Sequence, residues 1–341
     1  MSARIKKLGF FTRLLDDAGP AERYSLVTEQ IRTAERFGYH TAWVAQHHFH
    51  RDEGGLPAPL VFLAHVAART SRIRLATGVV TLPLEHPVRV AEDAVVLDLL
   101  SGGRLELGLG TGGTPESYAA FGHDHADRAT IYDEYIATLR KALAGADLGG
   151  GNRLYPAAGD LASRIWQATF SVPGGVRAGR AGDGLLLSRT QPRSKDNPAA
   201  DLHELQLPIV EAYHAALPAG VAPRILASRS VFVADSRAEA RRLAEIGLRR
   251  VAAHFAGSGH ILRGDTLDDL IRTLDSHVGT PDEVAESLAA DPTLDHATEV
   301  AIQVHSIDPP HPLILRSIEL FATRVAPAPG WADAPCLSEP A

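Results

Sequence analysis

The 341-residue sequence is poor in cysteine, and this scarcity excludes several kinds of chemistry. Its single cysteine, Cys336, lies in a proline-rich stretch near the end of the chain. An intrachain disulfide and a metal site built from several cysteines are therefore excluded, and we expect no cysteine nucleophile. Catalytic groups must come from other residue types.

Long apolar runs and an excess of positive charge are also lacking. The apolar runs are far shorter than the roughly 20 residues of a membrane-spanning helix, and the formal net charge of -7 offers no basic surface for nucleic acid. We therefore expect neither a membrane nor nucleic acid as a partner. The opening residues, MSARIKKLGFF, lack the apolar stretch and cleavage site of a secretory signal, which favours a cytoplasmic location.

Short apolar strands alternate with amphipathic helices along most of the chain. Such an order predicts an α/β fold with a parallel sheet, and eight units favour closure into a (β/α)8 TIM barrel. We expect one domain over residues 4–325, followed by an extended or frayed proline-rich tail at 326–341. The predicted strands are residues 8–11, 40–45, 73–78, 104–109, 164–169, 184–188, 225–234 and 298–305. The predicted helices are residues 24–34, 59–70, 88–100, 128–143, 175–181, 202–216, a segment from 237, and 314–325.

An insertion at residues 256–297 separates the seventh and eighth units. It contains a loop, GSGHILRGD, and two helical stretches at 268–274 and 281–288. Such a segment could be a mobile lid over the barrel mouth or a plain surface excursion, and the sequence leaves both open.

Histidines follow the second predicted strand, where an α/β barrel places its functional residues. The order is Gln46-His47-His48-Phe49-His50, with Asp52 close behind. These side chains could ligate a metal, but no second strand end completes a site, so we expect none. A histidine here fits better as an acid, a base or a hydrogen-bond donor. Simple packing at a strand end stays open, more so for His48 than for His47.

Glycines and hydroxyl residues follow the third, fourth and fifth strands. Gly78 ends the third strand, and the run 108–114 after the fourth is rich in glycine, which lets backbone approach an anion or a flat ring. Ser171 precedes a helix at the sequence SVPGGVR, where unpaired N–H groups could bind phosphate. An ordinary capped helix start is the alternative.

Three segments resemble the bacterial luciferase-like flavin-dependent monooxygenases, in their FMN-dependent branch. They are WVAQHHF at 43–49, TGVVTLPLEHPVRVAEDAVVLDLLSGGRLELGLGTG at 77–112, and IWQATFSVPGGVRAGRAGDGLLLSR at 165–189. The resemblance runs through nearly the whole chain in order. It implies a barrel that binds reduced FMN, supplied by a separate flavin reductase, and that uses O2 to oxygenate a small organic substrate.

The resemblance also implies roles for individual residues. His47, with His48 beside it, takes the place of the family's catalytic histidine, while Gln46 stands where the family commonly has Glu. A non-proline cis peptide is implied between Gly78 and Val79. Thr111 replaces an arginine that reaches the phosphate in some luciferases, so another group such as Arg180 would have to supply that contact. The implied cofactor-binding residues are Phe11, Thr77, Gly78, Val79, Gly110, Thr111, Ser171, Gly174, Gly175 and Ser188.

A homodimer is expected from the resemblance and from the predicted helix at 88–100. That helix carries Val90, Ala94, Val95 and Leu97 and is apolar around more than one face. Three other functions remain open. The barrel could bind a deazaflavin and transfer hydride, it could bind flavin without turnover, or it could hydrolyse a substrate with a metal ion.

Overall fold

Eight parallel strands form a closed barrel in the computed structural model, which describes residues 5–257, 264–304 and 309–333. Each strand pairs with the next along the chain, and pairing of the last strand with both the first and the seventh closes the ring. The predicted (β/α)8 barrel is therefore confirmed. The barrel strands are β1 (Lys7–Thr12), β2 (Thr41–Val44), β3 (Arg74–Thr77), β5 (Leu105–Gly110), β6 (Ile165–Ala168), β7 (Gly184–Leu187), β8 (Ile225–Val233) and β10 (Glu299–Gln303).

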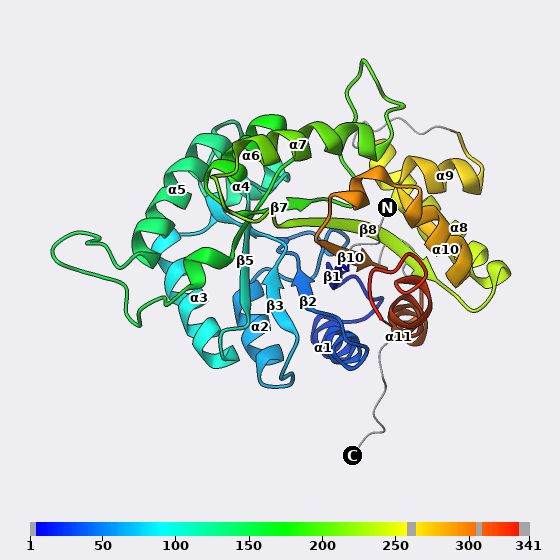
Figure 1. Cartoon of the computed structure of the whole chain (residues 1–341), viewed down its shortest axis with the longest axis horizontal. Helices are drawn as coiled ribbons and strands as arrows, with labels where there is room; N and C mark the ends of the chain where they lie inside the picture. The colour runs from blue at the N-terminus through cyan, green and yellow to red at the C-terminus, as the bar shows by residue number, and fades with distance from the viewer. Residues whose placement is uncertain (1–4, 258–263, 305–308, 334–341) are drawn as a thin grey trace.

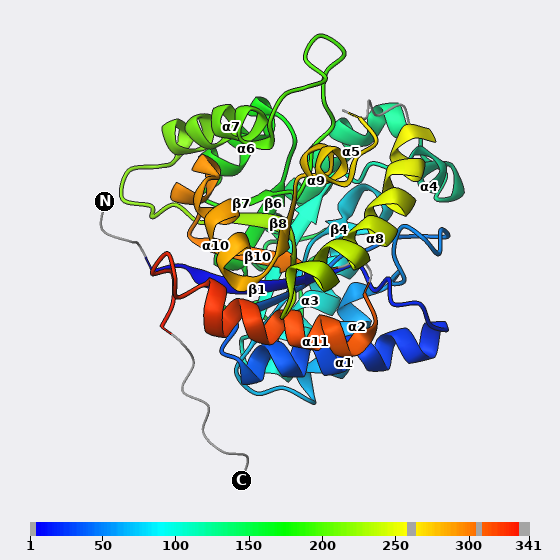
Figure 2. The ribbon, with the colours of Figure 1, turned by 90° about the vertical axis from the view of Figure 1, so that its right-hand side faces the viewer.

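Helices surround the strands and cover the outside of the barrel (Figure 1). Their apolar faces pack on the outward side chains of the strands and form the main hydrophobic core. The first and last of them, α1 and α11, lie side by side along one flank (Figure 2). The eight helices that follow barrel strands are α1 (Pro20–Arg36), α2 (Pro59–Ala67), α3 (Pro87–Ser101), α5 (Arg128–Leu143), α6 (Val172–Arg180), α7 (Leu202–Ala216), α8 (Arg237–Gly257) and α11 (His311–Leu320).

The inside of the barrel is filled by side chains that alternate with the outward ones along each strand. Trp43 and Trp166 meet edge to face at its centre, with ring centroids 5.4 Å apart. Small and aliphatic residues from the other strands complete this interior cluster, which consists of Trp43, Ala76, Trp166, Leu186, Leu226 and Ala301.

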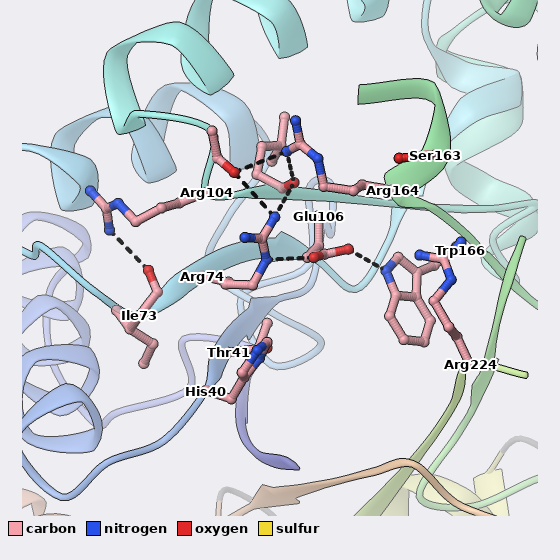
Figure 3. A network of polar contacts seen from close by, with 12 residues as sticks. His40, Thr41, Ile73, Arg74, Arg104, Glu106, Ser163, Arg164, Trp166 and Arg224 are labelled. Atoms are coloured by element: carbon pink, nitrogen blue, oxygen red, sulfur yellow. Dashed lines mark hydrogen bonds and ion pairs between the residues drawn. The ribbon is translucent and has the colours of Figure 1, made fainter. Parts of the chain in front are cut away.

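Carboxylates and arginines close the amino-terminal end of the barrel, beneath the two tryptophans. Glu106 accepts hydrogen bonds from Arg74 Nε at 2.5 Å and from Trp166 Nε1 at 2.7 Å (Figure 3). Glu299 accepts from Trp43 Nε1 at 2.7 Å, and burial raises the pKa of this carboxyl to about 7. In α/β barrels this end supports stability, while chemistry occurs at the opposite end.

The insertion between β8 and β10 contains a strand in addition to the two predicted helices, and this strand joins the insertion to the barrel. Helices α9 (Leu267–Thr273) and α10 (Pro281–Ala289) flank an additional strand, β9 (Ser276–Gly279), which pairs in parallel with the end of β8. Asp275, just before this strand, forms a two-bond ion pair with Arg193 at 2.6 and 2.8 Å. Most of the described insertion is therefore part of the barrel rim, while residues 258–263 of the predicted loop lie outside the described residues.

The tail departs from the expected extended form over the residues that the structure describes. A π-helix, Phe321–Val325, leads into turns through residue 330. Trp331 is buried, and its carbonyl accepts a hydrogen bond from Lys6 N at 2.7 Å. Burial of this aromatic side chain outweighs the tendency of a proline-rich stretch to fray. His305, the last residue of the eighth predicted strand, and residues 334–341 fall outside the described residues.

Candidate active site

An apolar floor lies at the carboxyl ends of β1, β3, β5 and β6. The ring of Phe11 and the side chains of Val79 and Ala168 pack on the interior cluster and stay partly exposed. A side chain at Gly78 would come within 2.7 Å of the Phe11 ring, and one at Gly110 within 2.7 Å of Val79. These two glycines therefore keep the floor flat. The peptide bond between Gly78 and Val79 is cis, as the resemblance implied.

Gln46 holds the segment that follows the cis peptide. Its amide oxygen accepts a hydrogen bond from Thr81 N at 2.7 Å, and its amide nitrogen donates to Glu85 at 2.6 Å and to the Pro57 carbonyl at 3.0 Å. Burial raises the pKa of Glu85, although the bond from Gln46 opposes this. An amide serves this position because it both donates and accepts, whereas an ionised carboxylate could only accept.

His47 follows β2 and lies at the barrel mouth. Its backbone N–H donates to the Leu56 carbonyl at 3.0 Å, and its Nδ1 edge lies against Gly54. Burial, helped by the charge of Arg13, lowers the pKa of its imidazole to about 3, so the ring is neutral near pH 7. Within the described part of the chain, its buried Nδ1 has no hydrogen-bond partner.

The structure separates His48 from His47. The ring of His48 packs edge to face on Phe121 with centroids 4.9 Å apart, next to the short helix α4 (Pro115–Ala120). The rings of His48, Phe49 and Phe121 all contact one another. Of the two histidines, His47 is the one beside the cationic groups of the mouth.

Two arginines at the mouth were not among the predicted site residues. Arg13 comes directly after β1, and Arg189 follows β7 by two residues. Burial lowers the pKa of Arg13 to about 10 and that of Arg189 to about 9, and Arg13 adds to the shift of Arg189. Both charges also act on His47. Their positions just after strand ends were the available signal, since functional residues of this fold lie there.

Ser171 is the N-cap of α6. Its hydroxyl accepts from Gly174 N at 3.3 Å, and its own N–H donates to Thr169 Oγ1 at 3.0 Å. Thr169 follows Ala168 of the apolar floor, so the two hydroxyls and the start of α6 adjoin that floor. An anion at this end of the helix would face N–H groups and the positive end of its dipole.

Two features of α6 were not predicted. Gly175 packs closely on α7, because a side chain there would come within 2.7 Å of the Ile209 carbonyl, and its contact with a cofactor stays a prediction. Arg180 lies in the last turn of α6, about 12 Å along the helix axis from its start at 1.5 Å per residue. That position makes Arg180 unsuited to a phosphate held at the N-terminus.

The remaining predicted cofactor residues, Thr77, Thr111 and Ser188, form hydrogen bonds within the chain. The Thr77 hydroxyl is fully buried and bonds to the backbone of Gly108, so it joins β3 to β5 instead of facing the mouth. The carbonyl of Thr111 accepts from Tyr118, and that of Ser188 accepts from Gln206 at 2.7 Å. Ser188 is half-buried, two residues after the inward-facing Leu186.

In the part of the chain that the structure describes, no group of three or more histidine, cysteine, aspartate or glutamate residues could hold a metal ion. None of the helices there is both long and apolar enough to cross a membrane.

Curated relatives match the chain over limited segments. It is 43% identical over 111 residues to 4-hydroxyprotoasukamycin monooxygenase of Streptomyces nodosus subsp. asukaensis, covering 33% of this chain and 30% of that protein. It is 33% identical over 100 residues to the oxygenase component of the flavin-dependent trigonelline monooxygenase of Acinetobacter baylyi, covering 29% and 28%. The chain thus spans about a third of the length of these relatives.

Solved structures match almost the whole chain. Monooxygenase RslO1 from Streptomyces bottropensis superposes with a TM-score of 0.74 at 27% identity, over 94% of this chain and 99% of that one. The oxygenating constituent of 3,6-diketocamphane monooxygenase from Pseudomonas putida, in complex with FMN, gives 0.75 at 20% identity, over 95% and 98%. The coenzyme F420-dependent tetrahydromethanopterin reductase from Methanopyrus kandleri gives 0.67 at 19%, over 95% and 99%. The last two share the fold.

The family described as luciferase-like monooxygenase matches residues 8–293. This match includes seven of the eight barrel strands, the cis peptide, His47 and the start of α6. The chain belongs to the luciferase-like monooxygenase family.

Proposed function

We propose that this chain is a flavin-dependent monooxygenase that uses reduced FMN and O2 to oxygenate a small organic substrate. The observation that carries this proposal is the flat apolar floor between Gly78 and Gly110, with a capped helix start on one side and a neutral histidine on the other. An isoalloxazine ring fits such a floor, and its phosphate fits the N-terminus of α6. FMN, when bound and reduced, supplies the electrons for O2 activation.

Each part of the site has a task in this proposal. Phe11 and Val79 offer apolar contact to the ring and help to exclude water. The hydroxyls of Thr169 and Ser171 and the N-terminal N–H groups of α6 bind phosphate. His47 is neutral, so its imidazole is able to accept a proton or a hydrogen bond from a substrate hydroxyl. Gln46 acts as a positioning residue for the segment after the cis peptide.

We also propose two partners. A separate flavin reductase would deliver reduced FMN, and the oxygenase component among the relatives supports this division of labour. A second copy of the chain would pack on α2 and α3. The apolar residues of α3 on which the dimer was predicted are buried within the chain and are not open to a second copy; they are Val90, Ala94, Val95 and Leu97. Other apolar side chains of α2 and α3 are exposed and form a face for that contact. That face consists of Val61, Val96, Leu99 and Leu100.

The second candidate function is hydride transfer with a deazaflavin, since a coenzyme F420-dependent reductase shares the fold. Absorbance spectra of the protein reconstituted with FMN or with a deazaflavin, recorded with binding titrations, separate the two. FMN is expected to bind with a defined stoichiometry and the deazaflavin weakly. Selective binding of the deazaflavin would refute the FMN proposal.

The activity test measures oxygen uptake with chemically reduced FMN against a panel of aldehydes, ketones and sulfonates, with His47→Ala and His48→Ala compared. Loss of a proton-transfer group lowers a rate by roughly 10²–10⁴-fold. We expect that loss in His47→Ala, with FMN affinity within a few fold and more oxygen consumed per product formed. His48→Ala should alter stability more than coupling, because its ring packs on Phe121. An unchanged rate and ratio in His47→Ala would remove this residue from the mechanism.

A further inference from the structure

A polar wall stands on β8 and β10, which lie opposite β3 and β5 in the ring. Gln303 of β10 and Ser228 of β8 face inward, because each lies two residues beyond a member of the interior cluster. Those members are Ala301 and Leu226. Ala301 pairs with Ser228, and Gln303 pairs with Ser230, so Gln303 is one inward position nearer to the mouth than Ser228. The wall thus places polar side chains above the apolar interior.

The amide of Gln303 is buried and unpaired. Its side chain belongs to a residue that is 1% exposed, and neither the amide oxygen nor the amide nitrogen has a hydrogen-bond partner in the described part of the chain. Ser228 Oγ, one inward position deeper, is likewise buried without a partner there. Buried polar atoms are almost always hydrogen-bonded, and leaving one unpaired costs free energy. An amide held in this way is suited to a partner from outside the chain.

Phe11 connects this wall to the flat floor. The register of β1 with β10, continued by one residue, places Phe11 beside Gln303. The ring of Phe11 is partly exposed, and a side chain at Gly78 would come within 2.7 Å of it. A molecule lying on the Phe11 ring would therefore have the Gln303 amide at one end and the floor at the other.

The two unpaired atoms of Gln303 define the chemistry of that molecule. A primary amide offers an acceptor oxygen and, beside it, an N–H donor. The complementary group carries a carbonyl oxygen next to an N–H on one edge, as carboxamides and lactams do. A ketone or an ester has no such donor and would leave the Gln303 oxygen unpaired, which a buried site penalises.

We propose that Gln303 is the specificity-determining residue of a substrate subsite, and that it selects a small molecule bearing a carboxamide or lactam group beside an apolar part. Phe11 would contact that apolar part. The inference rests on the proposed function, since it takes the floor as the flavin side. The pyrimidine ring of a flavin also carries a carbonyl beside an N–H, but Gln303 stands on β10, opposite β5 of the floor, which favours the substrate as its partner.

The test uses benzamide, which has both the carbonyl and the N–H, and acetophenone, in which a methyl group replaces the amide nitrogen. Calorimetric titrations measure both probes on the wild type, Gln303→Met and the control Gln30→Met, with oxidised FMN bound and without flavin. Methionine has a similar size to glutamine but lacks its amide. Gln30 is a fully buried glutamine of α1 whose amide nitrogen donates to Asp16 at 2.8 Å. FMN and N3-methylated FMN, which lacks the pyrimidine N–H, are titrated on the same proteins.

We expect the ratio of benzamide to acetophenone affinity to fall by about 10- to 100-fold in Gln303→Met, because two hydrogen bonds are lost. Gln30→Met should keep the wild-type ratio. The Tm of ligand-free Gln303→Met should hold or rise, because unpaired buried polar atoms are removed, whereas Gln30→Met should melt at a lower temperature. An unchanged ratio in Gln303→Met would overturn the proposal, and a lower Tm beside it would assign the glutamine a structural role.

Two further outcomes separate the substrate from the flavin. If Gln303→Met loses a preference for FMN over N3-methylated FMN while the probe ratio holds, the amide binds the flavin and the substrate assignment is wrong. If no flavin binds while the probe ratio still depends on Gln303, the amide subsite stands and the flavin proposal fails.

Discussion

Replacing Gln46 by Glu should destabilise the protein in a pH-dependent way. The substitution removes two donated hydrogen bonds, at 2.6 Å to Glu85 and 3.0 Å to the Pro57 carbonyl. Together these are worth about 2–4 kcal/mol, since bonds to charged groups are stronger than average. Two carboxylates would also face each other, with a repulsion of about 4 kcal/mol for charges 4 Å apart at an effective dielectric constant of 20. Protonation of one carboxyl relieves that repulsion and restores a donor.

The sign of the pH dependence follows from the raised pKa of this carboxyl pair. A carboxyl group whose pKa is higher in the folded than in the unfolded protein destabilises the folded state once the pH rises above the unfolded pKa, here about 4.5. At pH 8 we expect Gln46→Glu to lose about 6 kcal/mol, the lower end of that sum, and at pH 5, where one carboxyl is readily protonated, about 2 kcal/mol. With about 2.1 cal/mol/K of unfolding entropy per residue, 1 kcal/mol shifts Tm by about 1.4 °C in a chain of this length. The expected Tm loss is therefore about 8 °C at pH 8 and about 3 °C at pH 5.

Calorimetric or fluorescence melting at both pH values measures this effect, with Gln46→Met as the matched control. Methionine has a similar size but no hydrogen-bonding amide and no charge. The only pH-dependent interaction that it removes is the bond that stabilises ionised Glu85, so its loss should grow with pH less than that of Gln46→Glu. Equal Tm losses of Gln46→Glu and Gln46→Met at both pH values would refute the reasoning. They would show that Glu85 does not sense the charge at position 46.

Three other substitutions test separate parts of the molecule. Ser171→Asp should weaken FMN much more than riboflavin in fluorescence titrations, because a carboxylate at the start of α6 repels phosphate; equal losses would place the phosphate elsewhere. Glu299→Gln keeps an acceptor for Trp43 but removes a carboxyl with pKa of about 7. In urea titrations, the free energy of unfolding of the wild type should fall by about 3 kcal/mol between pH 4.5 and 8, and that of the variant should not. Gly54→Ala would place a methyl 2.5 Å from His47 Nδ1, so coupling of oxygen uptake to product should fall while FMN affinity holds.

The sequence predicted the barrel well because strand and helix periods alternate clearly. The predicted helices at 128–143 and 202–216 coincide with α5 and α7. Strand β9 was missed, since the four residues SHVG show no alternating pattern. Its stability comes from the end of β8, where Ser230–Val233 pair with β9 and the last three of these residues extend beyond the pairing with β10. Pairing of this kind depends on tertiary structure and leaves no local signal.

The candidate site was predicted in part, for physical reasons that differ between residues. The family resemblance implied the Gly78–Val79 cis bond, and the sequence SVPGGVR indicated the helix start that Ser171 caps. Arg13 and Arg189 were missed because an arginine after a strand usually lies in solvent, and only the fold shows that Arg189 is buried and Arg13 half-buried. The packing of Gly175 on α7 was not predicted, because a helix packed against its neighbour and a helix open to a ligand share the same glycine pattern.

The protonation state of His47 depends mainly on its place in the fold. Burial is the largest cause of its lowered pKa, the charge of Arg13 comes next, and Arg189 adds to the shift. A neutral imidazole is able to accept a proton, which is the role that the proposed function gives to this ring. Because burial contributes more than either arginine, the loss of one arginine charge should leave the ring neutral near pH 7.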